Sequence, residues 1–383
     1  MTDGFSTPPH DNGPPMGESA ESFIIELLSG RRRGAMASAL RGLLRIAESP
    51  YAALMRLRNK LYDLGTLRSH RVAPAVISVG NITAGGTGKT PTVVWLASSL
   101  RAAGFRPAVL LRGYGSSPGA PSDEATLLDE QLNPAEGGGV SIRIPIVAAP
   151  DRVASAKRAI VDHPHVNLLI LDDGFQHRRL ARNFDLLLID ATNPFGFDHV
   201  HPRGLLREPL AGLRRAHAFI ISRADLVPSS RISEIDEVLR AHNPTAPVYR
   251  ARHVLTSLKD QDDTPFPLTH LAGHRFLAAA AIGNPAAFDK QLKALPGKYS
   301  GHHWLPDHHD YKSEDLTHLY QLAVEVNADF ILTTEKDWTK LRRIFPTGQL
   351  PIFRVQLAIE FDGQGESGLL QFIRAQLENP RSP

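Results

Sequence analysis

A glycine-rich loop at residues 83–90 limits the fold of this chain more than any other segment. It reads Thr83-Ala-Gly-Gly-Thr-Gly-Lys-Thr90, with a short apolar run before it at residues 75–79 and an amphipathic pattern after it at residues 92–103. Such a loop between a strand and a helix directs backbone N–H groups and the helix dipole at phosphate oxygens. The sequence therefore predicts a nucleotide-binding segment made of Thr83, Ala84, Gly85, Gly86, Thr87, Gly88, Lys89 and Thr90.

Two residues of this loop have specific expected roles. Lys89 would reach the β- and γ-phosphates and act in catalysis, and Thr90 would hold Mg²⁺. The usual pattern begins with glycine, and Thr83 stands at that position. A glycine-rich turn with a surface lysine is the alternative. The intact Gly-x-Gly-Lys-Thr core and its setting favour the nucleotide site, with ATP and Mg²⁺ as cofactors.

Alternating apolar runs and amphipathic stretches predict an α/β fold. Near-continuous apolar runs are typical of parallel strands buried on both faces. After the first strand, they lie at residues 107–111, 166–171, 184–189 and 218–222, then at 276–282, 330–333 and 352–355. Helices are expected near residues 313–326 and 368–377. The prediction is a P-loop NTPase-type parallel sheet core, a second, smaller α/β domain and an N-terminal amphipathic helix.

The length of 383 residues favours more than one domain. We expect a disordered tail at residues 1–20, a membrane-associated helical segment at 21–70, a P-loop kinase domain at 71–257 and a smaller domain at 258–383. The last helix can pack on either domain. Residues 116–140 are rich in Gly, Pro and Ser and read as a long exposed loop, and residues 259–267 read as a connector.

Basic side chains gather near the N-terminus. Residues 31–70 hold nine Arg or Lys and two acidic residues, an excess of about seven positive charges that favours anionic partners. In a helix Met36, Leu40, Leu43, Leu44 and Ala47 share one face, with Arg41 and Arg45 opposite. Such a helix either lies on an anionic membrane or docks on the domain core. We expect no spanning helix and no export signal, and the absence of cysteine excludes disulfides and thiolate metal sites.

Acidic and histidine residues follow several predicted strands. Asp172 ends an apolar run and is the expected second Mg²⁺ anchor, although Asp-Asp-Gly is also good turn chemistry. His177, soon after it, can position a substrate. In the pair Asp123-Glu124, a carboxylate can accept a hydroxyl proton; the alternative is two solvated acids.

A histidine-rich segment lies at residues 302–309. The spacing of His302, His303, Asp307, His308 and His309 fits no usual zinc pattern, so a carboxylate–histidine pair is preferred. The segment Thr333-Thr-Glu-Lys-Asp337 has the look of a site loop without a role that its residue types define.

Together these segments resemble the tetraacyldisaccharide 4'-kinase (lipid A 4'-kinase) family. The resemblance is carried by eight ordered blocks: Val79 to Pro91, Arg112-Gly-Tyr-Gly115, Pro150-Asp-Arg-Val153, Asp172-Asp-Gly-Phe-Gln-His177, Leu206-Arg-Glu-Pro209, Ile282-Gly-Asn-Pro285, Asp307-His-His309 and Thr333-Thr-Glu-Lys-Asp337.

The resemblance implies transfer of the ATP γ-phosphate to the 4'-hydroxyl of tetraacyldisaccharide 1-phosphate, which forms lipid IVA in lipid A biosynthesis. It implies two closing α/β domains and an N-terminal membrane anchor on the cytoplasmic face of the inner membrane. The expected partners are an anionic membrane surface and the acylated glucosamine disaccharide 1-phosphate lipid, with no nucleic acid or protein partner.

The resemblance also implies site residues. Asp123 and His308 would act together in catalysis, although Ser122 and Ala125 replace the family's flanking Gly and Pro. The segment His201-Pro-Arg-Gly204 also departs from the family. The substrate-side candidates are Gln176, His177, Arg207 and Glu208.

Two rival interpretations come from the same residues. The loop also resembles that of switch-type ATPases that act at membranes without lipid kinase activity. Those carry a lysine just before the double glycine, where this chain has Ala84. The segment Ser222-Arg-Ala-Asp225 faintly resembles the guanine-reading loop of GTPases, with Arg223 in place of its lysine.

Overall fold

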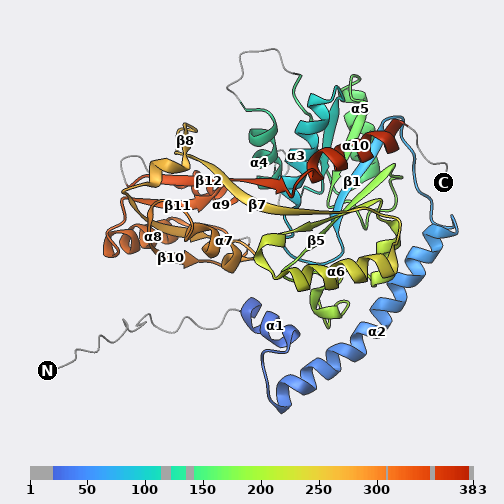
Figure 1. Ribbon diagram of the computed structural model, residues 1–383, viewed down its shortest axis with the longest axis horizontal. Helices are drawn as coiled ribbons and strands as arrows, with labels where there is room; N and C mark the ends of the chain where they lie inside the picture. Colours follow the sequence, from blue (N-terminus) through green and yellow to red (C-terminus); the bar gives the residue numbers. More distant parts are fainter. Residues whose placement is uncertain (1–19, 114–121, 135–141, 308, 346–349, 379–383) are drawn as a thin grey trace.

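The computed structural model describes residues 20–113, 122–134, 142–307, 309–345 and 350–378 (Figure 1). The described strands are β1 (Ala75–Asn81), β2 (Pro107–Leu111), β3 (Ile146–Ala148), β4 (Leu168–Asp172), β5 (Phe184–Asp190), β6 (Ala218–Ser222), β7 (Val248–Lys259), β8 (Pro265–Pro267), β9 (Arg275–Ala280), β10 (Lys298–Trp304), β11 (Phe330–Thr334) and β12 (Ile352–Phe361).

Helices cover both faces of the sheet that these strands form. They are α1 (Ala20–Ser29), α2 (Ala35–Asp63), α3 (Lys89–Ala102), α4 (Asp123–Leu132), α5 (Arg152–Asp162), α6 (Ser229–His242), α7 (Pro285–Leu292), α8 (Ser313–Glu325), α9 (Glu335–Leu341) and α10 (Gly365–Glu378). Short 3₁₀ turns are η1 (Gly196–Asp198), η2 (Leu210–Arg215), η3 (Ala224–Leu226) and η4 (Leu268–Leu271).

The first half of the sheet is parallel and follows the order β3-β2-β4-β1-β5-β6. Every residue of β2, β4, β5 and β6 is buried, which is why these strands read as continuous apolar runs. The P-loop connects β1, in the middle of this half, to α3. The predicted α/β class with a parallel core is confirmed.

Two long strands join this half to the second one. β7 pairs in parallel with β6 over residues 248–250, and antiparallel with β12 over residues 251–259. The order then continues β12-β11-β9-β10, so the described strands form one continuous sheet (Figure 1). The predicted domain boundary between residues 257 and 258 lies inside β7.

The prediction of an unbroken exposed loop over residues 116–140 is wrong, because residues 123–132 form α4. The Ser122 side chain caps the helix by accepting a hydrogen bond from the backbone N–H of Ala125. Leu128 and Leu132 are fully buried in the same core as the parallel strands. The many turn-forming residues around this segment hid its helical spacing.

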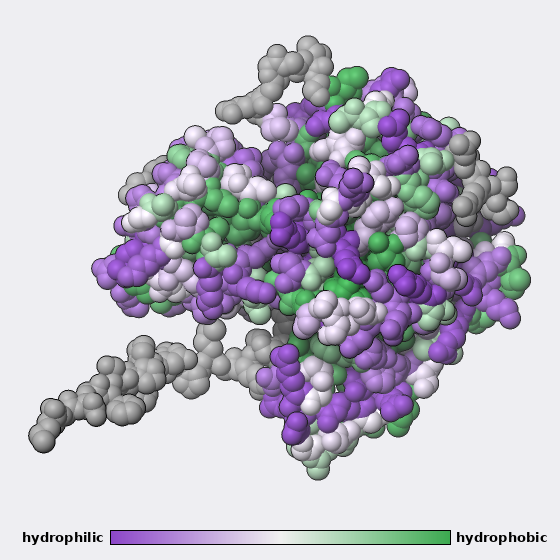
Figure 2. All heavy atoms as spheres, in the orientation of Figure 1, coloured by the Kyte–Doolittle hydropathy of each residue, from purple (hydrophilic) through white to green (hydrophobic). Residues whose placement is uncertain are grey.

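The N-terminal helix α2 has two different long faces. Ala52 is buried on the inner face, and the Tyr51 hydroxyl donates to the Arg207 carbonyl at 3.0 Å. The outer face carries an apolar stripe with exposed fractions of 54–79%, formed by Met36, Leu43, Ile46, Leu54, Leu57 and Leu64. Along the lower right margin in Figure 2, where α2 runs, hydrophobic residues lie beside strongly hydrophilic ones.

The predicted apolar face of this helix is therefore divided between two environments. Leu40 and Leu44 are partly buried, whereas Met36 and Leu43 are exposed. Among the described helices, none combines the length and the apolar character needed to cross a membrane.

Candidate active site

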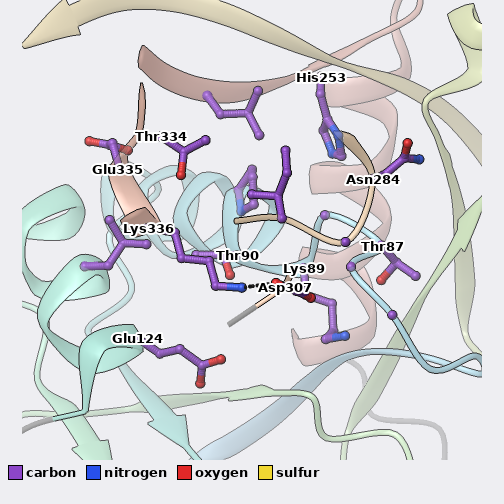
Figure 3. Close-up of a pocket in the computed structure, with 18 of the residues that line it drawn as sticks. Thr87, Lys89, Thr90, Glu124, His253, Asn284, Asp307, Thr334, Glu335 and Lys336 are labelled. Atoms are coloured by element: carbon purple, nitrogen blue, oxygen red, sulfur yellow. Dashed lines mark hydrogen bonds and ion pairs between the residues drawn. The ribbon is translucent and has the colours of Figure 1, made fainter. Parts of the chain in front are cut away.

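A cavity of about 1250 Å³ lies where the two halves of the sheet face each other. The first half contributes the P-loop from Gly85 onward and the acidic end of β4. The second half contributes Asp307 and Lys336. In Figure 3, Glu124 from the first turn of α4 and Lys336 from the start of α9 point toward the region of Lys89. Loops after parallel strands converge here, as in other open α/β sheets.

The P-loop divides into an anchored part and an open part. Residues 85–90 line the cavity. Thr83 is buried and bridges to Leu206, and the Ala84 backbone N–H donates to the Leu205 carbonyl at 2.7 Å. Of the predicted nucleotide-binding residues, these two hold the loop in place while the remaining six face the cavity.

Gly88 has to be glycine for two reasons. Its φ of +83° lies in the left-handed region. A Cβ at this position would also stand 2.1 Å from the Cε1 atom of His253, whose ring packs on the loop. His253 is almost fully buried, and burial lowers its pKa to about 3, so that the imidazole is neutral.

Lys89 lies at the base of the cavity between Asn81 and Asp173. Its Nζ atom is 3.2 Å from Asn81 Oδ1 and 3.6 Å from Asp173 Oδ1. Arg207 Nη1 donates to both oxygens of Asp173 at 2.8 Å. Burial works to raise the pKa of Asp173, but the neighbouring Lys89 and Arg207 lower it, so this carboxylate stays charged.

Asp172 is a buried carboxylate at the end of β4. Its pKa is raised to about 7, mainly by burial; Lys89 opposes this rise, and the charges of Asp173 and Glu124 add to it. Its buried Oδ1 atom has no hydrogen-bond partner. An orphaned carboxylate oxygen beside a phosphate-binding loop fits Mg²⁺, which takes oxygen ligands. Thr90, which also lines the cavity, offers a hydroxyl.

The two acids at the start of α4 face different groups. Asp123 Oδ1 accepts from Arg343 Nη2 at 2.6 Å. Glu124 points into the cavity, close enough to raise the pKa of Asp172. Both residues line the cavity. The predicted acidic pair is thus at the site, and its two carboxylates have separate surroundings.

The substrate-side candidates are divided in the same way. Arg207 lines the cavity. Glu208 is buried behind it, where it accepts from Arg215 at 2.8 and 2.9 Å, and from Asn59 of α2 at 2.7 Å. The side-chain amide of Gln176 donates to Glu208 Oε1 and to the Asn81 carbonyl, both at 3.1 Å. Gln176 and Glu208 therefore tie α2 to the strand that precedes the P-loop.

His177 is half-buried next to this network. Burial, together with the nearby charges of Arg152 and Arg112, lowers its pKa to about 4, so the ring is neutral at pH 7. A neutral imidazole can accept or donate a hydrogen bond but does not attract a phosphate by charge.

The second half of the sheet supplies Asp307 and Lys336, whose Oδ1 and Nζ atoms are 2.7 Å apart. His308, the expected partner of Asp123, lies outside the described residues. Within the described part of the chain no three His, Cys, Asp or Glu residues are grouped as a metal site. His302 stacks on Trp304, His303 contacts His318, and His309 pairs with Asp315.

Sequence reasoning gave no role to several charged residues of the cavity, and three of these are Arg152, Asp173 and Lys336. Arg152 is 3% exposed and donates to the carbonyls of Leu111, Ala149 and Asp172. Burial lowers its pKa to about 10. Each of the three lies in one of the eight ordered blocks named above, at a strand end or helix start. This placement was the signal from which a role in the site could have been predicted.

Comparisons with known proteins identify the family of this chain. The family model described as tetraacyldisaccharide-1-P 4'-kinase matches residues 40–378. The chain belongs to this family. A tetraacyldisaccharide 4'-kinase from Halothermothrix orenii is 35% identical over 351 residues, covering 86% of this chain and 90% of the relative. One from Syntrophus aciditrophicus is 39% identical over 322 residues, covering 76% and 85%.

A solved structure extends the likeness to three dimensions. The LpxK protein from Aquifex aeolicus, crystallised in complex with ATP, superposes with a TM-score of 0.66 at 26% identity. The match covers 88% of this chain and 99% of that one. Membership in the tetraacyldisaccharide-1-P 4'-kinase family disfavours both rival interpretations, the switch-type ATPase and the GTPase.

Proposed function

We propose that this chain is an ATP-dependent lipid kinase. It transfers the γ-phosphate of ATP to the 4'-hydroxyl of tetraacyldisaccharide 1-phosphate and so forms lipid IVA for lipid A. The observation that carries this proposal is the convergence, in one cavity of a chain of this family, of the P-loop lysine Lys89 with the acidic end of β4. The cavity thus offers groups for a triphosphate and room for an acceptor.

The nucleotide side of the reaction falls to the P-loop. Backbone N–H groups of residues 85–90 would hold the phosphates, and Lys89 would stabilise charge that develops on the β- and γ-phosphates. Asp172 and Thr90 would hold Mg²⁺. When bound there, Mg²⁺ supplies positive charge to the phosphate oxygens. Arg207 keeps Asp173 charged beside them.

The acceptor side involves one proton and one phosphoryl group. A bond forms between the 4'-oxygen and the γ-phosphorus, while the bond from that phosphorus to the β,γ-bridging oxygen breaks and releases ADP. The hydroxyl proton passes to Asp123, with His308 as its partner. The transition state is loose, so positioning contributes more than proton removal.

The acylated substrate would reach the site along α2. Its inner face is tied to the site through Asn59, which donates to Glu208, and Arg58, which donates to the Gln176 carbonyl at 2.8 Å. Its outer stripe is apolar, and the exposed side chains of Arg45, Arg56 and Lys60 lie on the same helix. A helix of this composition binds at the headgroup level of an anionic bilayer. We place the enzyme on the cytoplasmic face of the inner membrane.

The test is incubation with γ-labelled ATP, Mg²⁺ and tetraacyldisaccharide 1-phosphate, followed by location of the label on the lipid. We expect label at the 4'-position, and none with Lys89→Met. Hydrolysis of ATP without labelled lipid, stimulated by self-association, would instead support a switch-type ATPase. A preference for GTP over ATP in competition would support the GTPase reading of Ser222-Arg-Ala-Asp225.

A further inference from the structure

We propose that Lys336 binds the terminal phosphate of the nucleotide, from the side of the cavity opposite the P-loop. The proposal deepens the proposed function, because it takes a nucleoside triphosphate as the ligand of this cavity. It gives a role to the segment Thr333-Thr-Glu-Lys-Asp337, for which residue types and spacing had indicated only a site loop.

The backbone around Lys336 is held firmly. Lys336 is the second residue of α9, and this helix begins directly after β11. The next residue, Asp337, is 2% exposed, and its carboxylate accepts from the Thr334 hydroxyl at 2.6 Å and from the Ala281 N–H at 3.1 Å. These bonds join the ends of β9 and β11. The backbone of Lys336 is therefore held in a fixed position relative to the ends of β9 and β11.

Lys336 lines the same cavity as the P-loop. The Lys336 ammonium is 2.7 Å from Asp307 Oδ1, a pair marked by a dashed line in Figure 3, and both residues line the same cavity as Lys89. A Cβ built on Gly283 would be 3.1 Å from Asp307 Oδ2 and 3.8 Å from the Gly86 backbone nitrogen. The Asp307 carboxylate and an N–H of the phosphate-binding loop therefore border the same gap, and Lys336 lies at its edge.

The chemistry of the ammonium suits a phosphate in this gap. The side chains of Lys336 and Asp307 are 32% and 23% exposed, so the pair is neither deeply buried nor fully solvated. An ammonium has three N–H donors, so contact with Asp307 and contact with a phosphate oxygen are compatible. Because the negative charge of ATP is concentrated on its terminal phosphate, a second lysine facing Lys89 would interact mainly with that group.

The test compares two nucleotides that differ by the terminal phosphate. Binding of a non-hydrolysable ATP analogue and of ADP, each with Mg²⁺, is measured by calorimetry for the full chain and for Lys336→Ala and Lys336→Arg. We expect Lys336→Ala to weaken analogue binding about 10- to 100-fold, the size of a charge-assisted hydrogen bond, and ADP binding less than about threefold. Lys336→Arg keeps the charge and should recover part of the loss.

A matched control is Lys293→Ala. Lys293 pairs with Asp289 at 2.6 Å on α7, is 64% exposed and does not line the cavity, so its loss should leave both affinities unchanged. Equal losses for both nucleotides, or no loss for either, would overturn the proposal.

The binding measurement needs no lipid acceptor. If the unmodified chain binds the analogue but moves no phosphate to the lipid, the proposed function fails while the assignment of Lys336 stands. Conversely, labelled lipid with an unchanged ratio of analogue to ADP affinity in Lys336→Ala leaves the function intact and removes Lys336 from the phosphate site. Lys336→Arg protects the test against misfolding of the alanine variant.

Discussion

Arg343, in the turn after α9, donates to Asp123 at the start of α4 across 2.6 Å, and α9 and α4 belong to opposite halves of the sheet. A second ion pair joins Arg342, the C-cap residue of α9, to Glu130 of α4 at 2.5 Å. Both pairs are partly exposed, so each contributes at most about 1 kcal/mol to stability. The two ion pairs matter mainly for positioning, because they hold the first turn of α4 against the cavity.

The carboxylate of Asp123 has a testable part in the proposed reaction. If Asp123 accepts the hydroxyl proton, Asp123→Asn should lower kcat about 10²- to 10⁴-fold. The KM for ATP should change less than about threefold, because this carboxylate pairs with Arg343 from the opposite half of the sheet and is assigned to the acceptor side of the reaction. Steady-state kinetics with the lipid acceptor check both values.

The neighbouring acid is the matched control for that experiment. Glu124→Gln removes an equal charge one residue later, on a side chain that points into the cavity. We expect a smaller loss of kcat than for Asp123→Asn. The reverse order would make Glu124 the proton acceptor.

Lys89 should be indispensable for turnover. Its ammonium is the P-loop cation at the base of the cavity, and its side chain is 15% exposed. Lys89→Met keeps most of the side-chain volume and removes the charge, so we expect kcat to fall at least about 10²- to 10³-fold. Thermal unfolding should show a folded protein, because Arg207 still neutralises Asp173. Turnover near that of the unmodified chain would exclude Lys89 from the phosphate site.

Apolar strands were predictable because burial on both faces leaves an unmistakable pattern. The expected strand at residues 184–189 is β5 (Phe184–Asp190), and the expected strand at 330–333 is β11 (Phe330–Thr334). The strand β10 (Lys298–Trp304) was read as a histidine-rich segment, because it lies at the edge of the sheet formed by the described strands, next to β9, and mixes polar with aromatic side chains. Edge strands need no continuous apolar run.

The site was predictable where backbone chemistry dictates it, as in the P-loop. Side-chain direction was not. Gln176 and Glu208 follow strands in the pattern of substrate contacts, yet both take part in a buried network with Arg215. A motif records which residues sit near a site, but only packing decides which way each one points. The ion pair of Asp307 with Lys336 was not predictable either, because these residues follow two different strands, β10 and β11.

Gly80 should tolerate no side chain. A Cβ there would lie 2.7 Å from the Phe175 Cβ and 2.9 Å from the Phe175 backbone nitrogen, and Phe175 is fully buried. The contact involves backbone, so a rotamer change cannot relieve it. We expect Gly80→Ala to lower the free energy of unfolding by about 1–3 kcal/mol in urea titrations.

Gly42 is the control for that substitution. It lies inside α2, and a Cβ there meets nothing within 4 Å. Gly42→Ala should raise stability by about 0.5–1 kcal/mol, because alanine loses less backbone entropy in a helix. Equal effects of the two substitutions would contradict the close approach of β1 to Phe175.

The outer stripe of α2 should control membrane binding. We expect the triple variant Leu43→Glu, Leu54→Glu, Leu57→Glu to lose co-sedimentation with anionic vesicles, because the stripe would no longer enter the headgroup region. The fold should persist, since these side chains are 54–63% exposed. Val161→Glu with Val324→Glu is the matched control, on residues that are 74% and 73% exposed elsewhere. Vesicle binding that survives the triple variant would place the membrane surface elsewhere.

His253 should make the chain sensitive to acid. Burial and the charge of Arg223 lower its pKa from 6.5 to about 3. Below pH 6.5 the unfolded chain therefore binds a proton that the folded chain does not, and stability is lost as the pH falls from 6.5 toward 3. At pH 5 this loss is about 2 kcal/mol.

In urea titrations at pH 7 and pH 5, His253→Gln should reduce the difference between the two free energies of unfolding by about that amount. An undiminished acid loss in His253→Gln would mean that the ring beside Gly88 is accessible to protons in the folded chain.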